Sequence, residues 1–304
     1  MLVHVLGSAA GGGFPQWNCN CPNCSRQRRG EFKGAARTQS SITVSADGKR
    51  WLLVNASPDI RAQIASFPAL WPARAARDSA IAAVLLVDAQ IDHTAGLLFL
   101  REAGALEVYC TDNVYRELSG NFPVLKLLEH YCAVRRHVIP TAQAAEFSVA
   151  GATRLRFTAL AVASKAPPYS PNRQRPQPGD TIALGIEDTL TGKRLFYAPV
   201  LGAAEPHLLR IMERADCVMV DGTFWRDDEL ALVGLGSRRA RDMGHLPQSG
   251  PDGMIELLRP LAKARKILIH INNTNPILDE ASPERVILER AGIEVAGDGL
   301  EVEL

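Results

Sequence analysis

The sequence predicts an α/β fold, a single four-layer αββα sandwich that spans residues 1–304. Strand-like patterns dominate both halves of the chain, and each half closes with helix-like segments. No linker rich in Gly, Ser or Pro separates the two halves. A chain of 304 residues, 46% hydrophobic and 22% charged, has the length and the composition to bury a large core.

Composition and charge exclude several classes of function. The net charge of +1 gives no general attraction for nucleic acid or for an anionic membrane. No apolar run approaches the ~20 residues of a membrane span, and residues 1–6 lack the basic leader of a signal peptide. We therefore expect a cytoplasmic protein with no nucleic-acid or membrane partner, whose six cysteines are thiols or metal ligands rather than disulfides.

The first half of the chain begins with a short strand pattern at residues 2–6, followed by a glycine-rich segment at residues 7–13. This segment lacks the Lys-Ser/Thr pair of a phosphate-binding loop, so we expect a structural turn near the site. Residues 37–45 and 49–55 predict a hairpin that turns at Asp47-Gly48. Helices are expected at 58–67, 97–103, 112–119 and 124–131, and strands at 107–111, 138–139 and 146–149.

Residues 84–97 form the stretch around which the candidate site is built. A buried apolar strand pattern ends in polar residues, among them Asp92 and His93, and Gly96 and a helical segment follow. A carboxylate next to an imidazole at the exit of a strand is a ligand arrangement suited to zinc or iron. The alternative is an Asp92 that caps the helix beside a solvent-exposed His93.

The second half repeats the pattern of strands and helices. We expect a long strand at 154–162, a hairpin of 181–187 and 193–198, and buried strands at 217–224 and 266–270. Asp221, in the first of these buried strands, could act at a site or cap a turn. Helices are expected at 207–212, 253–258 and 284–291, and residues 294–296 and 300–304 are expected to close the sheet.

A cluster of cysteines predicts a second, structural metal site. Cys19, Cys21 and Cys24 follow one another at the spacing Cys-x-Cys-x-x-Cys, which lets three thiolates wrap one tetrahedral zinc ion. A fourth ligand would come from elsewhere in the chain. Such a closed site would hold the loop of about residues 14–30 and carry out no chemistry. The other cysteines stand singly in apolar surroundings and are expected in the core.

Residues 165–179 form the only long irregular segment, because their prolines disfavour both helix and sheet. The segment carries Lys165, Arg173 and Arg175 and no acidic residue. It could be a mobile surface loop, or it could cover the site and present cations to an anionic substrate.

The central motif, Asp-x-Gln-x-Asp-His-x-x-Gly-Leu, resembles the His-x-His-x-Asp-His-x-x-Gly motif of the metallo-β-lactamase superfamily. Asp92 and His93 match that motif, whereas Asp88 and Gln90 stand at its first two histidines. His270, at the end of the last buried strand, matches the superfamily's final histidine. The resemblance implies that one metal site, formed by Asp92, His93 and His270, is kept.

Further departures from the superfamily pattern fall at the other metal site. Residues 163–165 lack the superfamily's third histidine, and residues 198–200 lack its bridging aspartate. Asp88 could still approach the metal as an additional oxygen ligand. Gly244-His245 resembles the Gly-His of the tRNA 3′-processing nuclease branch, which implies that His245 donates a proton. Asn273 stands where the similar phosphonate-pathway phosphodiesterase has a histidine zinc ligand, so the fourth ligand of the cysteine site stays open.

Within the superfamily, three motifs resemble a family of proteins that take part in the synthesis of the coenzyme pyrroloquinoline quinone (PQQ). They are Gly-Ser-Ala-Ala-Gly-Gly-Gly-Phe-Pro-Gln-Trp-Asn-Cys-x-Cys-x-x-Cys, Asp-x-Gln-x-Asp-His and His-Ile-Asn-Asn-Thr-Asn-Pro. The resemblance covers essentially the whole chain. It implies a mononuclear iron(II) hydroxylase that uses O₂ to oxidise the tyrosine ring of a Glu-Tyr unit from a precursor peptide. Other proteins of the pathway are possible partners.

The residues in this reading have the following expected roles. His93 and His270 would supply two nitrogens and Asp92 one oxygen, and such a set with open coordination positions is that of non-heme iron oxygenases. Asp92 would also lie close to the reacting atoms. His245 would transfer protons, and Arg173, Arg175 or Lys165 would hold the substrate's carboxylates. The same ligand set suits a mononuclear zinc hydrolase. A carrier of PQQ or its precursor towards the periplasm is the non-catalytic alternative.

Overall fold

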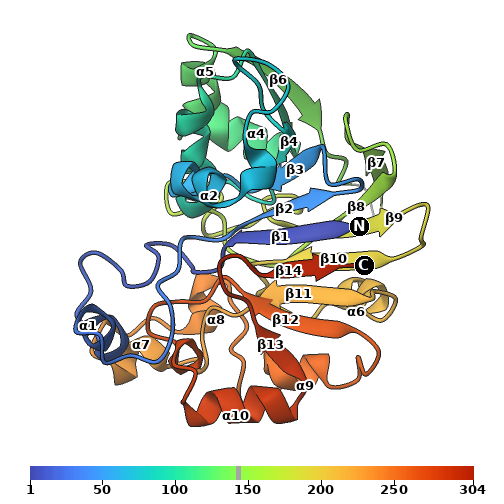
Figure 1. Ribbon diagram of the computed structural model, residues 1–304. Coiled ribbons are helices and arrows are strands. Elements are labelled where there is room, and N and C mark those ends of the chain that lie inside the picture. Colours follow the sequence, from blue (N-terminus) through green and yellow to red (C-terminus); the bar gives the residue numbers. More distant parts are fainter. Residues whose placement is uncertain (142–144) are drawn as a thin grey trace.

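Two seven-stranded sheets pack face to face, and helices cover the outer face of each, as Figure 1 shows. The structure is a computed structural model, and it describes residues 1–141 and 145–304. Three apolar clusters fill the spaces between the layers: one lies between the sheets and one lies outside each sheet. The four-layer αββα sandwich expected from the sequence is therefore confirmed.

The first sheet is built from the N-terminal half of the chain and one strand from the C-terminus. Strands β3 to β6 run parallel to one another, whereas β14, β1, β2 and β3 pair antiparallel. The order across the sheet is β14 (Glu301–Glu303), β1 (Leu2–Gly7), β2 (Ser41–Ser45), β3 (Trp51–Val54), β4 (Ile81–Leu85), β5 (Ala105–Cys110) and β6 (Ala133–Val138).

The second sheet is built from the C-terminal half. Strands β10 to β13 run parallel, and β7 to β10 pair antiparallel. The order is β13 (Ile293–Val295), β12 (Arg265–Ile269), β11 (Cys217–Asp221), β10 (Arg194–Ala198), β9 (Ile182–Asp188), β8 (Leu155–Ala161) and β7 (Glu146–Ser148).

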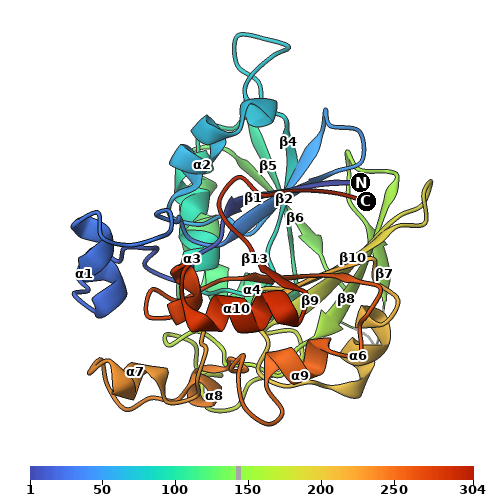
Figure 2. The same ribbon diagram turned by 60° about the horizontal axis from the view of Figure 1, so that its bottom comes forward.

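The helices are short and divide between the two outer layers. Those on the first sheet are α2 (Ile60–Ser66), η1 (Pro68–Leu70), α3 (Ile91–Thr94), η2 (Ala95–Leu100), α4 (Asp112–Ser119) and α5 (Val124–Leu128). Those of the other half are α1 (Pro22–Arg28), α6 (Pro206–Met212), α7 (Glu229–Leu232), α8 (Ala240–Met243), α9 (Met254–Leu258), η3 (Pro276–Leu278) and α10 (Pro283–Arg290). Figure 2 shows α9 and α10 side by side over the second sheet.

Strand β11 shows why the inner strands appear as continuous apolar runs in the sequence. Cys217 and Met219 face the core between the sheets, whereas Val218 and Val220 face the outer core under the helices. A parallel strand covered on both faces needs an apolar residue at every position. The run ends at Asp221, where the strand leaves the sheet and the candidate site begins.

The C-terminal strands differ from the expectation. Residues 294–296 and 300–304 were expected to close one sheet, but they belong to two: β13 lies at the edge of the second sheet and β14 at the edge of the first. Val302 pairs with Val3 of β1, so the chain crosses between the sheets after β13. Alternation of apolar residues identifies a strand but not its partner, because either open edge can satisfy its backbone groups.

Within the described residues, 1–141 and 145–304, the structure has no helix with the length and apolar character needed to span a membrane.

Candidate metal centre

Three side chains from opposite sheets meet at one edge of the sandwich. Asp92 and His93 lie on α3, which follows β4, and His270 follows β12 directly. One ligand atom of each lies within 4.8 Å of the others. Asp92 Oδ2 is 3.2 Å from His270 Nε2 and 4.0 Å from His93 Nε2. The structure thus brings together the three residues that the sequence proposed as ligands.

Two glycines allow the chain to pack closely around Asp92 and His93. A Cβ at Gly96, in the motif Asp-His-x-x-Gly, would overlap the backbone oxygen of Ser57. A Cβ at Gly11 would lie 3.3 Å from Asp92 Oδ2. The glycine-rich segment after β1 is therefore a turn packed against the site, as the sequence predicted.

His93 is held by Asp88, a residue for which the sequence left the role open. His93 Nδ1 lies 2.8 Å and 3.0 Å from the two oxygens of Asp88, and one of these also accepts from the Gln90 backbone. Asp88 is thus occupied in orienting the imidazole rather than exposed as a ligand. Nε2, on the other side of the ring, is buried and has no hydrogen-bond partner among the described residues. A metal ion would satisfy this nitrogen.

The charge around His93 favours cations. Burial opposes the charged form of the imidazole, but the carboxylates of Asp88, Asp92 and Asp221 outweigh it and raise the pKa of His93 to about 9. Burial likewise opposes ionisation of Asp92, but His93 and His270 lower its pKa. The same carboxylates would also attract a metal ion, which would displace the proton from His93 on binding.

His270 is held in the same way by Thr223. His270 Nδ1 lies 2.9 Å from Thr223 Oγ1, whose hydroxyl donates to Asp221 Oδ1 at 2.6 Å. This leaves Nε2 to face Asp92. His270 has a φ of 62°, a left-handed conformation that is costly for a residue with a side chain. The backbone therefore turns sharply at the point where the imidazole must leave the sheet.

Asp221 connects His270 to the candidate proton donor, His245. Asp221 Oδ2 lies 2.8 Å from His245 Nδ1 and accepts from the Leu201 backbone, while Oδ1 accepts from Thr223. Both oxygens of this fully buried carboxylate are thus in use, which supports a positioning role rather than metal binding. Burial opposes ionisation of Asp221, but His245, His270 and Thr223 lower its pKa.

A cavity of about 210 Å³ opens over these groups, and its lining includes Asp92, His245, His270 and Arg173. Of the three cations named from the sequence, only Arg173 lines this cavity. Lys165 lines a neighbouring cavity of about 420 Å³, and exposed Arg175 lines neither. Backbone hydrogen bonds from Arg173 to Ser170 and from Arg175 to Asn172 form tight turns in this segment.

The irregular segment 165–179 is fastened to the first half of the molecule. Its Tyr169 hydroxyl donates to the Ala89 backbone, its Ser170 hydroxyl donates to Glu117, and the Thr111 hydroxyl donates to the Gly179 backbone. These contacts favour the expectation of a segment that covers the site over that of a free surface loop.

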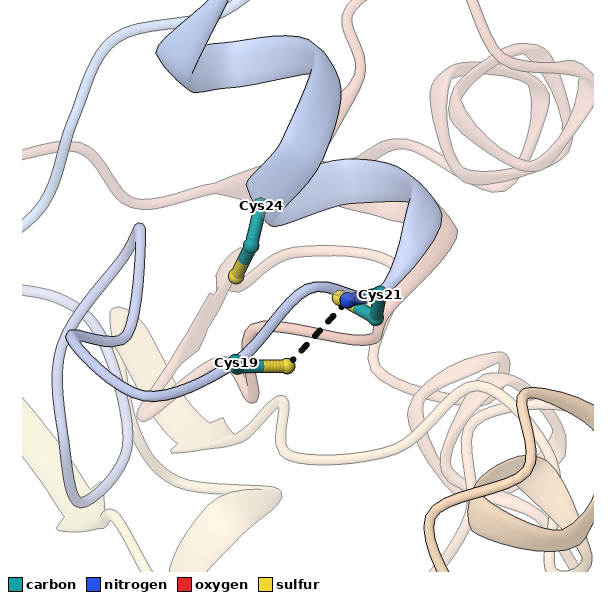
Figure 3. Close-up of side chains that lie close together, drawn as sticks. All are labelled: Cys19, Cys21 and Cys24. Atoms are coloured by element: carbon teal, nitrogen blue, oxygen red, sulfur yellow. Dashed lines mark hydrogen bonds between the residues drawn. The ribbon is translucent and has the colours of Figure 1, made fainter.

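The cysteine cluster forms a second candidate metal centre. Cys19, Cys21 and Cys24 are buried, and their sulfur atoms lie within 4.8 Å of one another. Figure 3 shows the three side chains pointing toward one another. Asn273 Nδ2 lies 3.1 Å, 3.6 Å and 3.3 Å from the three sulfurs. Three convergent thiols fit a tetrahedral zinc ion, and the Asn273 side chain lies against all three sulfurs.

Sequence reasoning missed the supporting residues Thr223 and Arg238. Arg238 lines the same cavity as Asp92 and His270. Thr223 comes two residues after Asp221 at the exit of a buried strand, a spacing that could have pointed to it. Nothing in the pattern around Arg238 distinguishes it from neighbouring arginines.

Comparison with known proteins agrees with this geometry. The Beta-lactamase superfamily domain model matches residues 50–271. The chain is 61% identical to the coenzyme PQQ synthesis protein B of Methylobacillus flagellatus and 56% identical to that of Pseudomonas aeruginosa, with full coverage of all chains. The chain belongs to the coenzyme PQQ synthesis protein B family. This confirms the resemblance drawn from the sequence motifs.

Solved structures show the same fold. The crystal structure of zinc-bound PqqB from Methylobacterium extorquens has a TM-score of 0.92 at 39% identity, with both chains fully covered. A diphosphatase of the PhnP family has a TM-score of 0.66 at 19% identity over 96% of its chain. The short form of human tRNase Z has a TM-score of 0.57 at 15% identity over 99% of its chain. The last two similarities concern the fold alone.

Proposed function

We propose that this protein takes part in PQQ synthesis as a mononuclear iron-dependent oxygenase that hydroxylates the tyrosine ring of a Glu-Tyr intermediate. Membership of the PQQ synthesis protein B family supports the pathway. The observation that carries the chemistry is the donor set of Asp92, His93 and His270, in which His93 Nε2 is buried without a partner. One carboxylate and two imidazoles form the ligand set of non-heme iron oxygenases.

The protein's own residues would orient the ligands and move protons. Bound ferrous iron would supply the activation of dioxygen, which no amino-acid side chain provides. Asp88 and Thr223 hold the outer nitrogens of His93 and His270, so that both Nε2 atoms face Asp92. The rings of His245 and His270 are stacked with centroids 5.5 Å apart, which places His245 beside the donor set as the candidate for proton transfer.

The cysteine centre would have a structural role. Zinc bound by Cys19, Cys21 and Cys24 would hold the loop around α1 in shape, and this loop contacts Asn273, three residues beyond His270. The two centres would thus be connected through one short segment.

The test compares metals in one assay. Protein purified anaerobically is loaded with iron(II) or with zinc and is given a Glu-Tyr substrate in buffer with or without O₂. We expect oxygen consumption and a hydroxylated tyrosyl product only with iron and O₂, and their loss in His270→Ala. His130→Ala, at an exposed histidine outside the site, is the matched control. Full turnover by the zinc form without O₂ would reject the proposal.

A mononuclear zinc hydrolase is the second candidate, because a relative at 39% identity is described as zinc-bound. It predicts turnover of a phosphodiester or peptide by the zinc form, with His245 as proton donor. A carrier for PQQ or its precursor predicts instead tight PQQ binding that survives both His93→Ala and His270→Ala.

A further inference from the structure

Two arginines from different segments face the cavity over the donor set. Arg173 comes from the irregular segment 165–179, and Arg238 comes from the connection between α7 and α8. Both line the cavity of about 210 Å³ that also contains Asp92 and His270. The sequence singled out Arg173 but not Arg238.

Neither guanidinium has an acidic partner. Across residues 1–141 and 145–304, no carboxylate oxygen lies within 4.0 Å of a nitrogen of Arg173 or Arg238. The neighbouring Arg239 differs, because it lies 3.7 Å from Asp227. Asp227 thus pairs with Arg239, whereas Arg238 lines the cavity without a carboxylate partner among the described residues.

The two positive charges disfavour each other. Burial of Arg173 and the nearby charge of Arg238 both lower the pKa of Arg173. Two like charges at the mouth of a partly buried cavity are unfavourable unless an anion lies between them. Guanidinium groups bind carboxylates through two parallel hydrogen bonds, so a pair of them suits a carboxylate.

We propose that Arg173 and Arg238 together bind a carboxylate of the substrate and so hold its phenol ring towards Asp92 and His270. This inference rests on the proposed function for the identity of the substrate, since a Glu-Tyr intermediate carries carboxylates and no phosphate. Arg173, which also donates to the Ala166 backbone, is fastened within its segment. Arg238 is exposed and supplies the second side of the site.

The test uses two ligands that differ only in the carboxylate. Binding of para-hydroxyphenylpropanoate and of the corresponding amide to the zinc-loaded full chain is measured by calorimetry. We expect the acid to bind about tenfold more tightly than the amide, because its charged hydrogen bonds are lost in the amide. Arg173→Gln and Arg238→Gln should each weaken binding of the acid by about tenfold and leave binding of the amide unchanged.

Arg239→Gln is the matched control, since it removes an adjacent exposed arginine that is paired with Asp227. Arg238→Lys should restore part of the affinity, because it keeps the charge but not the planar fork. Equal affinity for acid and amide, or equal losses in Arg238→Gln and Arg239→Gln, would overturn the proposal. Competition by inorganic phosphate and by acetate is measured in the same assay. If phosphate displaces the acid more strongly than acetate does, Arg173 and Arg238 bind phosphate rather than a carboxylate, and the proposal is overturned.

The binding assay needs neither iron nor oxygen. If hydroxylase activity is absent while binding of the acid still requires both arginines, only the proposed function fails. If activity is present while the two arginine variants bind the acid normally, only the carboxylate site fails.

Discussion

At the scale of single residues, each histidine of the candidate site has one ring nitrogen held by a neighbour. Asp88 holds His93, Thr223 holds His270, and Asp221 holds His245. Fixing one nitrogen selects the tautomer and the orientation of the ring, so the other nitrogen stays available, and for His93 and His270 it lies near Asp92. The chemistry of the site therefore depends on Asp88, Thr223 and Asp221 as well as on the three proposed metal ligands, although Asp221 also lies within 4.8 Å of His245 and His270 in a group that could hold a metal ion.

Asp221→Asn tests this arrangement. The amide keeps the shape of the side chain but cannot accept from Leu201, Thr223 and His245 with both of its outer atoms. We expect kcat to fall by about 100-fold or more, the scale of a lost acid–base group, with little change in KM. Turnover is measured on the iron-loaded protein together with its metal content, which should not change.

Asp216→Asn is the control for this variant. Asp216 lies just before the opposite end of β11, where it pairs with Lys193 at the surface. That variant should keep its kcat. Loss of the bound iron from Asp221→Asn would instead assign Asp221 to the metal, and an unchanged kcat would remove it from the mechanism.

At the scale of elements, the loop that contains α1 depends on the cysteine cluster. Helix α1 spans only Pro22–Arg28, with Cys24 as its single buried residue. A helix of this length is not stable by itself, and its tertiary contacts must hold it. Asn23 donates to the backbone oxygens of Asn273 and Asn275, so the loop rests on the turn after β12.

Cys24→Ala should therefore remove about one zinc ion per chain and lower the melting temperature, since structural zinc contributes directly to folding. Metal analysis and thermal unfolding measure the two effects. Cys132→Ala, at a buried cysteine outside both clusters, should keep its zinc. Full zinc content in Cys24→Ala would show that the cysteines do not hold the ion.

At the scale of the whole molecule, the donor set joins the two sheets. Asp92 and His93 follow a strand of the first sheet, whereas His270 follows a strand of the second. A metal ion held by all three would bind only when both sheets are folded and correctly placed. Binding to the folded state alone stabilises that state in proportion to the logarithm of the free metal concentration.

Zinc or iron(II) at about 100 times its Kd should thus stabilise the folded chain by about 2.7 kcal/mol. The gain is measured as a rise in melting temperature of Cys24→Ala, in which the cysteine centre no longer contributes. Adding His93→Ala to that variant should abolish the rise, and adding His130→Ala should preserve it. A rise that persists without His93 would place the metal elsewhere.

Much of the fold and of the site could be predicted from local patterns. Alternating and continuous apolar runs identified most strands, because burial on one or both faces dictates residue type at each position. Asp92, His93 and His270 stood out because they are potential ligands at the exits of buried strands, and the cysteine cluster stood out because its spacing suits one zinc ion. Family membership followed from the same motifs and is confirmed by the relatives.

Only the tertiary structure decided which residues serve those ligands. Sequence spacing does not indicate that Thr223 approaches His270, that Arg173 rather than Arg175 lines the cavity, or that Arg238 lines it too. Nor does it indicate that the last two strands separate to different sheets. These outcomes depend on packing between segments distant in the chain, whereas residue type and strand character are set by each residue's own chemistry and burial.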